Sequence, residues 1–155
     1  MKNKTSFLII ILAVFIILGC ESDDTDPCFN VDPLFQNFVI ELVDADGNNL
    51  IENNTYIRSE IKVFLNENVI GGVPEPAVPV NFISIELLAV ADNQVLEVVL
   101  GNNDTDELIL SIESGEPGGC GLIPLTVTNA TYNGTERTII PKDEIDNIPK
   151  IVVVK

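Results

Sequence analysis

The chain has 155 residues, of which 24 are aspartate or glutamate, 8 are lysine or arginine and none is histidine, so its formal net charge is −16. A surface this acidic repels phosphate backbones, and we therefore expect no nucleic-acid partner. Without histidine the chain has no histidine-based catalytic triad and no histidine-ligated zinc, and its length suits one domain that follows a leader.

The N-terminal segment combines a short basic head with an apolar core. Lys2 and Lys4 precede an unbroken apolar run over residues 7–18. As a helix this run would be about 18 Å long, well short of the ~30 Å hydrocarbon core of a bilayer. The segment therefore favours a secretory signal peptide over a transmembrane anchor.

The apolar run ends at Leu18-Gly19-Cys20, which is an aliphatic residue, a small residue and a cysteine. This pattern resembles the lipobox of bacterial lipoproteins. The resemblance implies cleavage after Gly19 and attachment of a diacylglycerol, with acyl chains such as palmitate, to the sulfur of Cys20. Two or three such chains are enough for stable anchoring to a membrane. The alternative is an ordinary secretory signal in which Cys20 is only a thiol near the cut.

Four acidic residues follow the cysteine within residues 21–26. Such a run is typical of a solvated, self-repelling tether, and it also resembles the acidic export signal of surface lipoproteins in Bacteroidota. We expect a signal peptide at 1–19, an acidic tether at 20–27 and one domain at 28–155. The resemblance implies that the protein is lipid-anchored to the outer membrane of the cell envelope, and it leaves open whether the periplasmic or the external face carries it.

After residue 37 the apolar residues recur with period two, which is typical of half-buried strands. Phe38, Ile40 and Leu42 share one face of the first such run, and Ile83, Ile85 and Leu87 are the inward candidates of a later one. We expect seven to eight strands within residues 38–43, 57–65, 80–89, 95–100, 107–112, 122–128, 132–140 and 151–154. The fold class is therefore all-β, with a single antiparallel β-sandwich of immunoglobulin-like or transthyretin-like type as the expected architecture and a small barrel as the alternative.

Two cysteines remain once Cys20 is assigned to lipid. Cys28 and Cys120 form an even pair in an exported chain, which favours one disulfide over two free thiols. Such a bridge would close a loop of roughly 90 residues and stabilise the domain by about 4–5 kcal/mol in the chain-entropy model.

Two acidic loops carry the spacing that a calcium site would use. Asp44, Asp46 and Asn48 lie two residues apart, and residues 102, 104 and 106 repeat this spacing with Asn, Asp and Asp. Oxygen ligands at such positions can surround a hard cation, but the glycine and glutamate that an EF-hand loop requires are out of place. Turn formation explains both loops equally well, so we assign no metal, no cofactor and no catalytic residue, and leave calcium at these loops open.

The remaining features indicate a binding protein rather than an enzyme. We expect a membrane-anchored, non-enzymatic binding or accessory module that recognises an unknown protein or glycan through its loops. The alternative is a structural or assembly subunit that pairs with another chain through its C-terminal edge strand, residues 151–154, which Lys150 and Lys155 flank.

Overall fold

The computed structural model describes residues 36–74, 81–101, 103–117, 123–141 and 148–155. The predicted signal peptide (1–19) and tether (20–27) lie outside the described residues, as do the predicted lipid attachment at Cys20 and the predicted Cys28–Cys120 disulfide. These assignments remain predictions.

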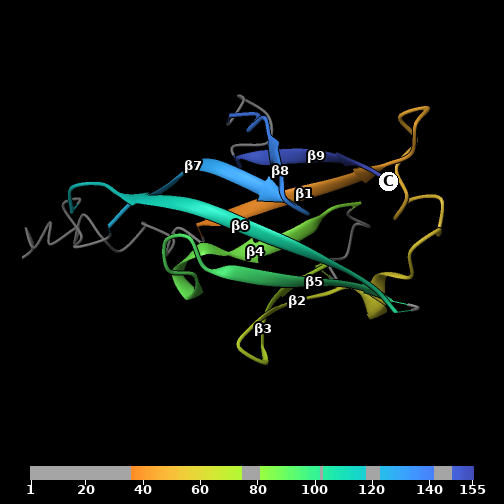
Figure 1. The fold of residues 1–155 in the computed structure, drawn as a ribbon, viewed down its shortest axis with the longest axis horizontal. Coiled ribbons are helices and arrows are strands. Elements are labelled where there is room, and N and C mark those ends of the chain that lie inside the picture. The colour runs from red at the N-terminus through yellow and green to blue at the C-terminus, as the bar shows by residue number, and fades with distance from the viewer. Residues whose placement is uncertain (1–35, 75–80, 102, 118–122, 142–147) are drawn as a thin grey trace, which may run out of the picture. The chain divides into compact units, whose positions relative to one another are not determined.

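The described residues form an all-β structure, which confirms the predicted fold class (Figure 1). The strands are β1 (Asn37–Val43), β2 (Lys62–Leu65), β3 (Asn68–Gly72), β4 (Ile83–Glu86), β5 (Val95–Gly101), β6 (Asp104–Ser114), β7 (Leu125–Tyr132), β8 (Thr135–Arg137) and β9 (Lys150–Val154). Two single 3-10 turns, η1 (Arg58–Glu60) and η2 (Leu87–Ala89), interrupt them. Across the described ranges no helix is both long and apolar enough to traverse a bilayer.

All nine strands belong to one hydrogen-bonded sheet in the order β8-β7-β6-β5-β2-β3-β4-β1-β9. Neighbours are antiparallel except β1 and β9, which are parallel. The expected division into two sheets of seven to eight strands therefore needs correction. The sheet stays continuous because β3 pairs with β4 through a short ladder, in which Gly71 lies opposite Ile85 and Gly72 opposite Ser84.

The sheet folds back on itself into a nearly closed barrel, so that β5, β6 and β7 lie over β1 and β4 in Figure 1. We call the line along which the β8 and β9 edges of the sheet approach each other the seam. At one end of the seam Ile140 and Lys150 exchange two backbone hydrogen bonds of 2.8 and 3.0 Å. At the other end the Lys155 side chain reaches Asp106 on β6. Strand tilt and curvature of this kind bring the two edges of a sheet together.

The core consists mainly of the inward faces of β1, β2, β4, β5, β6, β7 and β9. Phe38, Ile40 and Leu42 on β1 are completely buried, as the alternation predicted, and Ile83 and Ile85 on β4 are as well. The loop between β1 and β2 adds its own apolar residues, Leu50 and Ile51, to the same cluster. The outward residues of β1 are consequently free to line a surface site.

Two turns lie where the sequence analysis did not place them. Residues 66 and 67 have φ values of 48° and 70°, so β2 turns back into β3, which was not predicted as a strand. Asn133 (φ 49°) and Gly134 (φ 71°) make the two-residue turn between β7 and β8, whereas the expected strands at 122–128 and 132–140 placed the connection at residues 129–131. Both turns use the positive-φ conformation that two-residue hairpins require.

Candidate functional site

A pocket of about 310 Å³ lies on the outer side of β1 and β9. Because side chains alternate along a strand, Val39 and Glu41 face away from the core that Phe38 and Ile40 fill. Lys150 lies beside Val39 in the parallel β1–β9 register. We call this site the outer pocket; it is lined by Val39, Glu41, Asn49, Glu52, Asn81, Phe82, Ile148 and Lys150.

Hydrogen bonds fix the loops that form one wall of the outer pocket. The Asn49 side chain donates to the carbonyl of Asn81 at 2.8 Å, and its oxygen accepts from the backbone N–H groups of Ile51 and Glu52 at 2.9 and 3.0 Å. A guanidinium nitrogen of Arg58 donates to the Asn81 side-chain oxygen at 2.5 Å. Two loops that are distant in the sequence are thus held in one arrangement, as a preformed binding site requires.

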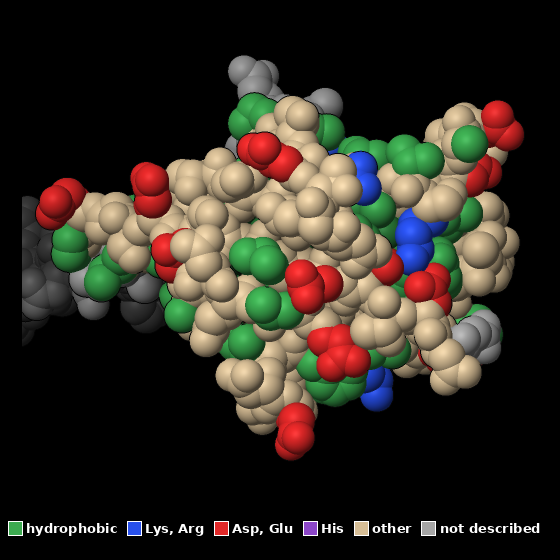
Figure 2. Space-filling model, in the orientation of Figure 1, with side chains coloured by type: hydrophobic (Ala, Val, Ile, Leu, Met, Phe, Trp, Pro, Cys, Tyr) green, Lys and Arg blue, Asp and Glu red, His purple; other side chains and the backbone are tan. Residues whose placement is uncertain are grey.

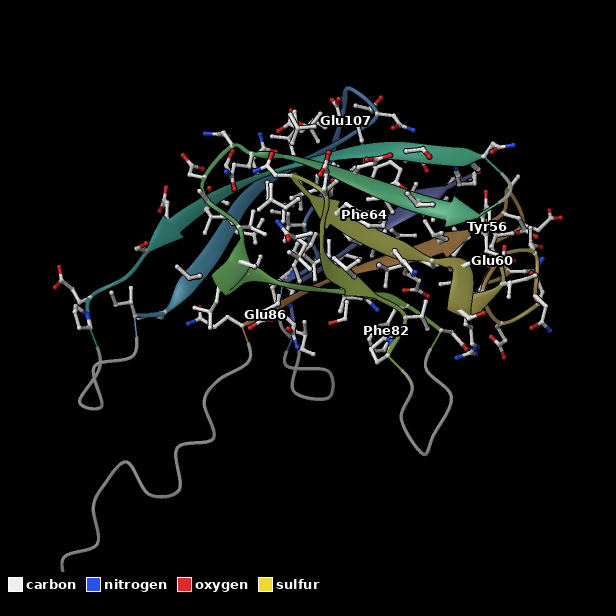
Figure 3. All side chains as sticks on the ribbon, turned by 90° about the horizontal axis from the view of Figure 1, so that it is seen from below. Tyr56, Glu60, Phe64, Phe82, Glu86 and Glu107 are labelled. Carbon is white, nitrogen blue, oxygen red and sulfur yellow. The ribbon has the colours of Figure 1, made fainter. Side chains whose placement is uncertain are left out.

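The outer pocket combines an apolar wall with charged groups. Val39 is buried, while Phe82 and Ile148 are partly exposed. Figure 3 shows Phe82 projecting beyond the strands from the segment that precedes β4. Lys150 approaches Glu41 with an Nζ–Oε2 distance of 3.3 Å, and both side chains are about one-third exposed (28% and 33%). An ion pair this exposed is worth at most about 1 kcal/mol, so it can rearrange around a ligand.

A second polar group, the Lys155 cluster, lies where β1, β7 and β9 end and β6 begins. It consists of Tyr56, Asp104, Asp106, Tyr132, Asn133 and Lys155. The Asp106 carboxylate accepts hydrogen bonds from Lys155 Nζ (2.7 Å), the Tyr132 hydroxyl (2.7 Å) and the Asn133 amide (2.6 Å). Asp104 accepts from Lys155 (3.1 Å) and from the Tyr56 hydroxyl (2.8 Å).

In the Lys155 cluster the hydrogen bonds and burial keep Asp106 ionised, Tyr132 protonated and Lys155 charged at neutral pH. Burial, followed by the hydrogen bond to Asp106, raises the pKa of Tyr132. Burial alone would raise the pKa of Asp106, but hydrogen bonds from Lys155, Asn133 and Tyr132 outweigh it and lower that pKa. Burial would lower the pKa of Lys155, and its bonds to Asp106 and Asp104 raise it. At neutral pH the lysine is therefore charged and the tyrosine protonated, so neither is set up as a nucleophile or base.

Turn hydrogen bonds account for the first of the two loops with calcium-like spacing. One carboxylate oxygen of Asp44 accepts from the N–H groups of Asp46 (2.9 Å) and Asn48 (2.8 Å), and the other accepts from the Asn48 side chain (2.9 Å). These bonds, with that from the Asn48 side chain the largest, lower the pKa of Asp44.

In the second loop Asn102 lies outside the described residues, and the carboxylates of Asp104 and Asp106 are bonded to Lys155. Among the described residues no group of three or more Cys, Asp or Glu side chains is placed to hold a metal ion.

Of the residues that line the outer pocket, only Lys150 was named from the sequence, as a residue that flanks the C-terminal strand. Glu41 interrupts an apolar run on β1. This could have been used to predict that the outward face of β1 is accessible to solvent or to a ligand, because a charged side chain is rarely buried without a partner. Asn49, Glu52, Asn81 and Phe82 belong to loops whose relative position depends on the rolled sheet. Comparison of the chain with protein-family models, curated proteins and solved structures gives no match.

Proposed function

We propose that the protein is a lipoprotein of the bacterial cell envelope, anchored to the outer membrane through lipid on Cys20, and that its domain is a non-enzymatic binding module whose ligand occupies the outer pocket. The observation that carries the binding function is the pocket itself, because hydrogen-bonded loops keep it open on a rigid sheet. The lipobox resemblance at Leu18-Gly19-Cys20 and the acidic segment after it support the location.

The charge distribution fits a protein that binds cations or basic partners and does not bind nucleic acid. Figure 2 shows acidic side chains spread over the face that β5, β6 and β7 present, with few basic ones between them. Such a surface attracts cations and basic partners, and it repels phosphate.

Assembly through β9 is a second candidate function. β9 is the last strand of the sheet, and in a parallel ladder the backbone groups of alternate residues, here Val152 and Val154, point away from β1. We place it second because Lys150, on the same edge, already pairs with Ile140, which leaves a short stretch for a partner strand.

The anchoring part of the proposal is tested by the mass of the protein purified from membranes. We expect the mature chain to begin at Cys20 and to carry diacylglycerol on that sulfur. Cys20→Ser should remain uncleaved and lose the lipid, because serine lacks the thiolate that forms the thioether. A mature wild-type chain with an unmodified cysteine would contradict lipid anchoring and leave an ordinary secretory signal.

A further inference from the structure

Apart from the Lys150 ammonium, the charged groups of the outer pocket are hydrogen-bond acceptors, the carboxylates of Glu41 and Glu52. The side-chain amide oxygens of the pocket are already used within the protein, since that of Asn49 accepts from two backbone N–H groups and that of Asn81 accepts from Arg58. The acceptors left to a ligand are mainly the two carboxylates of the pocket.

These carboxylates keep most of their capacity. Lys150 contacts one oxygen of Glu41. Over the described part of the chain, no hydrogen bond or ion pair engages the Glu52 carboxylate. An ionised carboxylate accepts hydrogen bonds and donates none, so the complementary ligand group is a cationic donor.

The remaining walls suit the aliphatic part of such a ligand. Val39, Phe82 and Ile148 contribute apolar surface, which alkyl stems of cationic side chains cover readily, and an aromatic ring also attracts a cation over its face. Lys150 shows that an alkylammonium group is accommodated here, since its own ammonium lies 3.3 Å from Glu41. The net charge of −16 raises the local concentration of any cation.

We propose that the outer pocket binds a primary alkylammonium group, with the ammonium against Glu52, the second oxygen of Glu41 as a further acceptor and the alkyl stem against Phe82. This inference rests on the proposed binding function and adds the class of ligand. A lysine side chain of a basic protein segment and a free diamine both supply this chemistry.

The test is a titration of the full chain, purified in detergent and kept in about 0.1 M salt, where the Debye length is about 10 Å, followed by backbone amide NMR shifts. The probes are Nα-acetyl-lysine amide, its Nε-acetylated form and cadaverine. We expect saturable shifts in residues 39–41 and 49–52 with the first and third probes and none with the second, which lacks the charge. Glu52→Gln should weaken binding about fivefold, or about 1 kcal/mol, through loss of one exposed charge-assisted contact.

Glu86→Gln is the matched control. Glu86 is an exposed glutamate at the far end of β4 from Phe82. Its replacement should change the affinity by less than about twofold, because salt screens a carboxylate at that position from a ligand in the pocket. Tighter binding of the lysine derivative than of cadaverine would identify a protein segment as the source, and the reverse order would identify a free amine.

Two results would overturn the inference: equal losses in Glu52→Gln and Glu86→Gln, or no saturable shift with either amine. If a photo-crosslinker at Phe82 still captures a ligand in cells, the class of ligand is wrong and the binding function stands. If that crosslinker also captures nothing, the binding function fails too.

Discussion

Replacing Asp106 with alanine is expected to lower the free energy of unfolding by about 3 kcal/mol, because removing one partner of a buried ion pair leaves the other uncompensated. The Asp106 side chain is only 5% exposed and Lys155 is 19% exposed. The substitution would also remove the acceptor for the hydroxyl of Tyr132, which is almost fully buried. Since these bonds join β6, β7 and β9, their loss opens the seam of the sheet.

The same residue makes stability depend on pH in a defined direction. Folding lowers the pKa of Asp106 below its ordinary value of 3.8, so its contribution is complete above that value and disappears as the pH falls through the lower, folded pKa. The advantage of the wild type over Asp106→Asn should therefore be full at pH 7 and shrink steadily below pH 3.8. Urea unfolding at several pH values measures both quantities.

Asp46→Ala is the control for Asp106. Asp46 is exposed, and within the described ranges only its backbone N–H is hydrogen-bonded, so the substitution should change stability by less than about 0.5 kcal/mol. Equal effects of the two substitutions would contradict the role assigned to the Lys155 cluster.

Replacing Gly71 with alanine is expected to destabilise the fold by about 3 kcal/mol, at the upper end of what overpacking costs. A Cβ atom at residue 71 would lie 2.5 Å from the carbonyl oxygen of Ser84 and 3.2 Å from the Cα of Ile85. Both are backbone atoms of β4, so neither can move aside alone. The substitution acts on the short β3–β4 ladder that keeps the sheet continuous.

Gly47→Ala separates this steric effect from the general cost of removing a glycine. Gly47 has a φ of 86° and nothing within 4 Å of the added atom, so it should lose only about 1 kcal/mol through left-handed backbone strain. The comparison uses guanidinium unfolding midpoints. A loss at Gly71 no larger than that at Gly47 would show that β3 and β4 separate without consequence.

The alternation of apolar residues was a sufficient guide to the strands that form the core. It gave the inward faces of β1 and β4, where Phe38, Ile40, Ile83 and Ile85 are completely buried, although the apolar Val39 lies on the outward face of β1. It missed β3, whose two glycines have low strand propensity, although Gly71 is needed there because the backbone of β4 leaves no room for a Cβ atom. Strand propensity therefore gave no sign that one sheet runs through this point.

The site was less accessible to sequence reasoning than the fold. Asp104 and Asp106 were noted for a spacing that suits calcium, whereas the structure pairs both with Lys155, about fifty positions further along the chain. The periodicity of apolar residues and the spacing of acidic ones describe residues that are close along the chain. The contacts of Lys155 with Asp104 and Asp106 form across the seam of the rolled sheet, so these patterns could not predict them. The outer pocket depends in the same way on the approach of the loops at Asn49 and Asn81.

The most direct test of the account is photo-crosslinking from the outer pocket in living cells. A photoreactive residue at Phe82 should give one saturable adduct, visible as a discrete mass or gel shift, and Glu52→Gln should diminish it. The same residue at Leu88, which is 62% exposed beyond the other end of β4, should give none. Adducts of equal yield at both positions, or none at Phe82, would contradict the assignment of this pocket as the binding site.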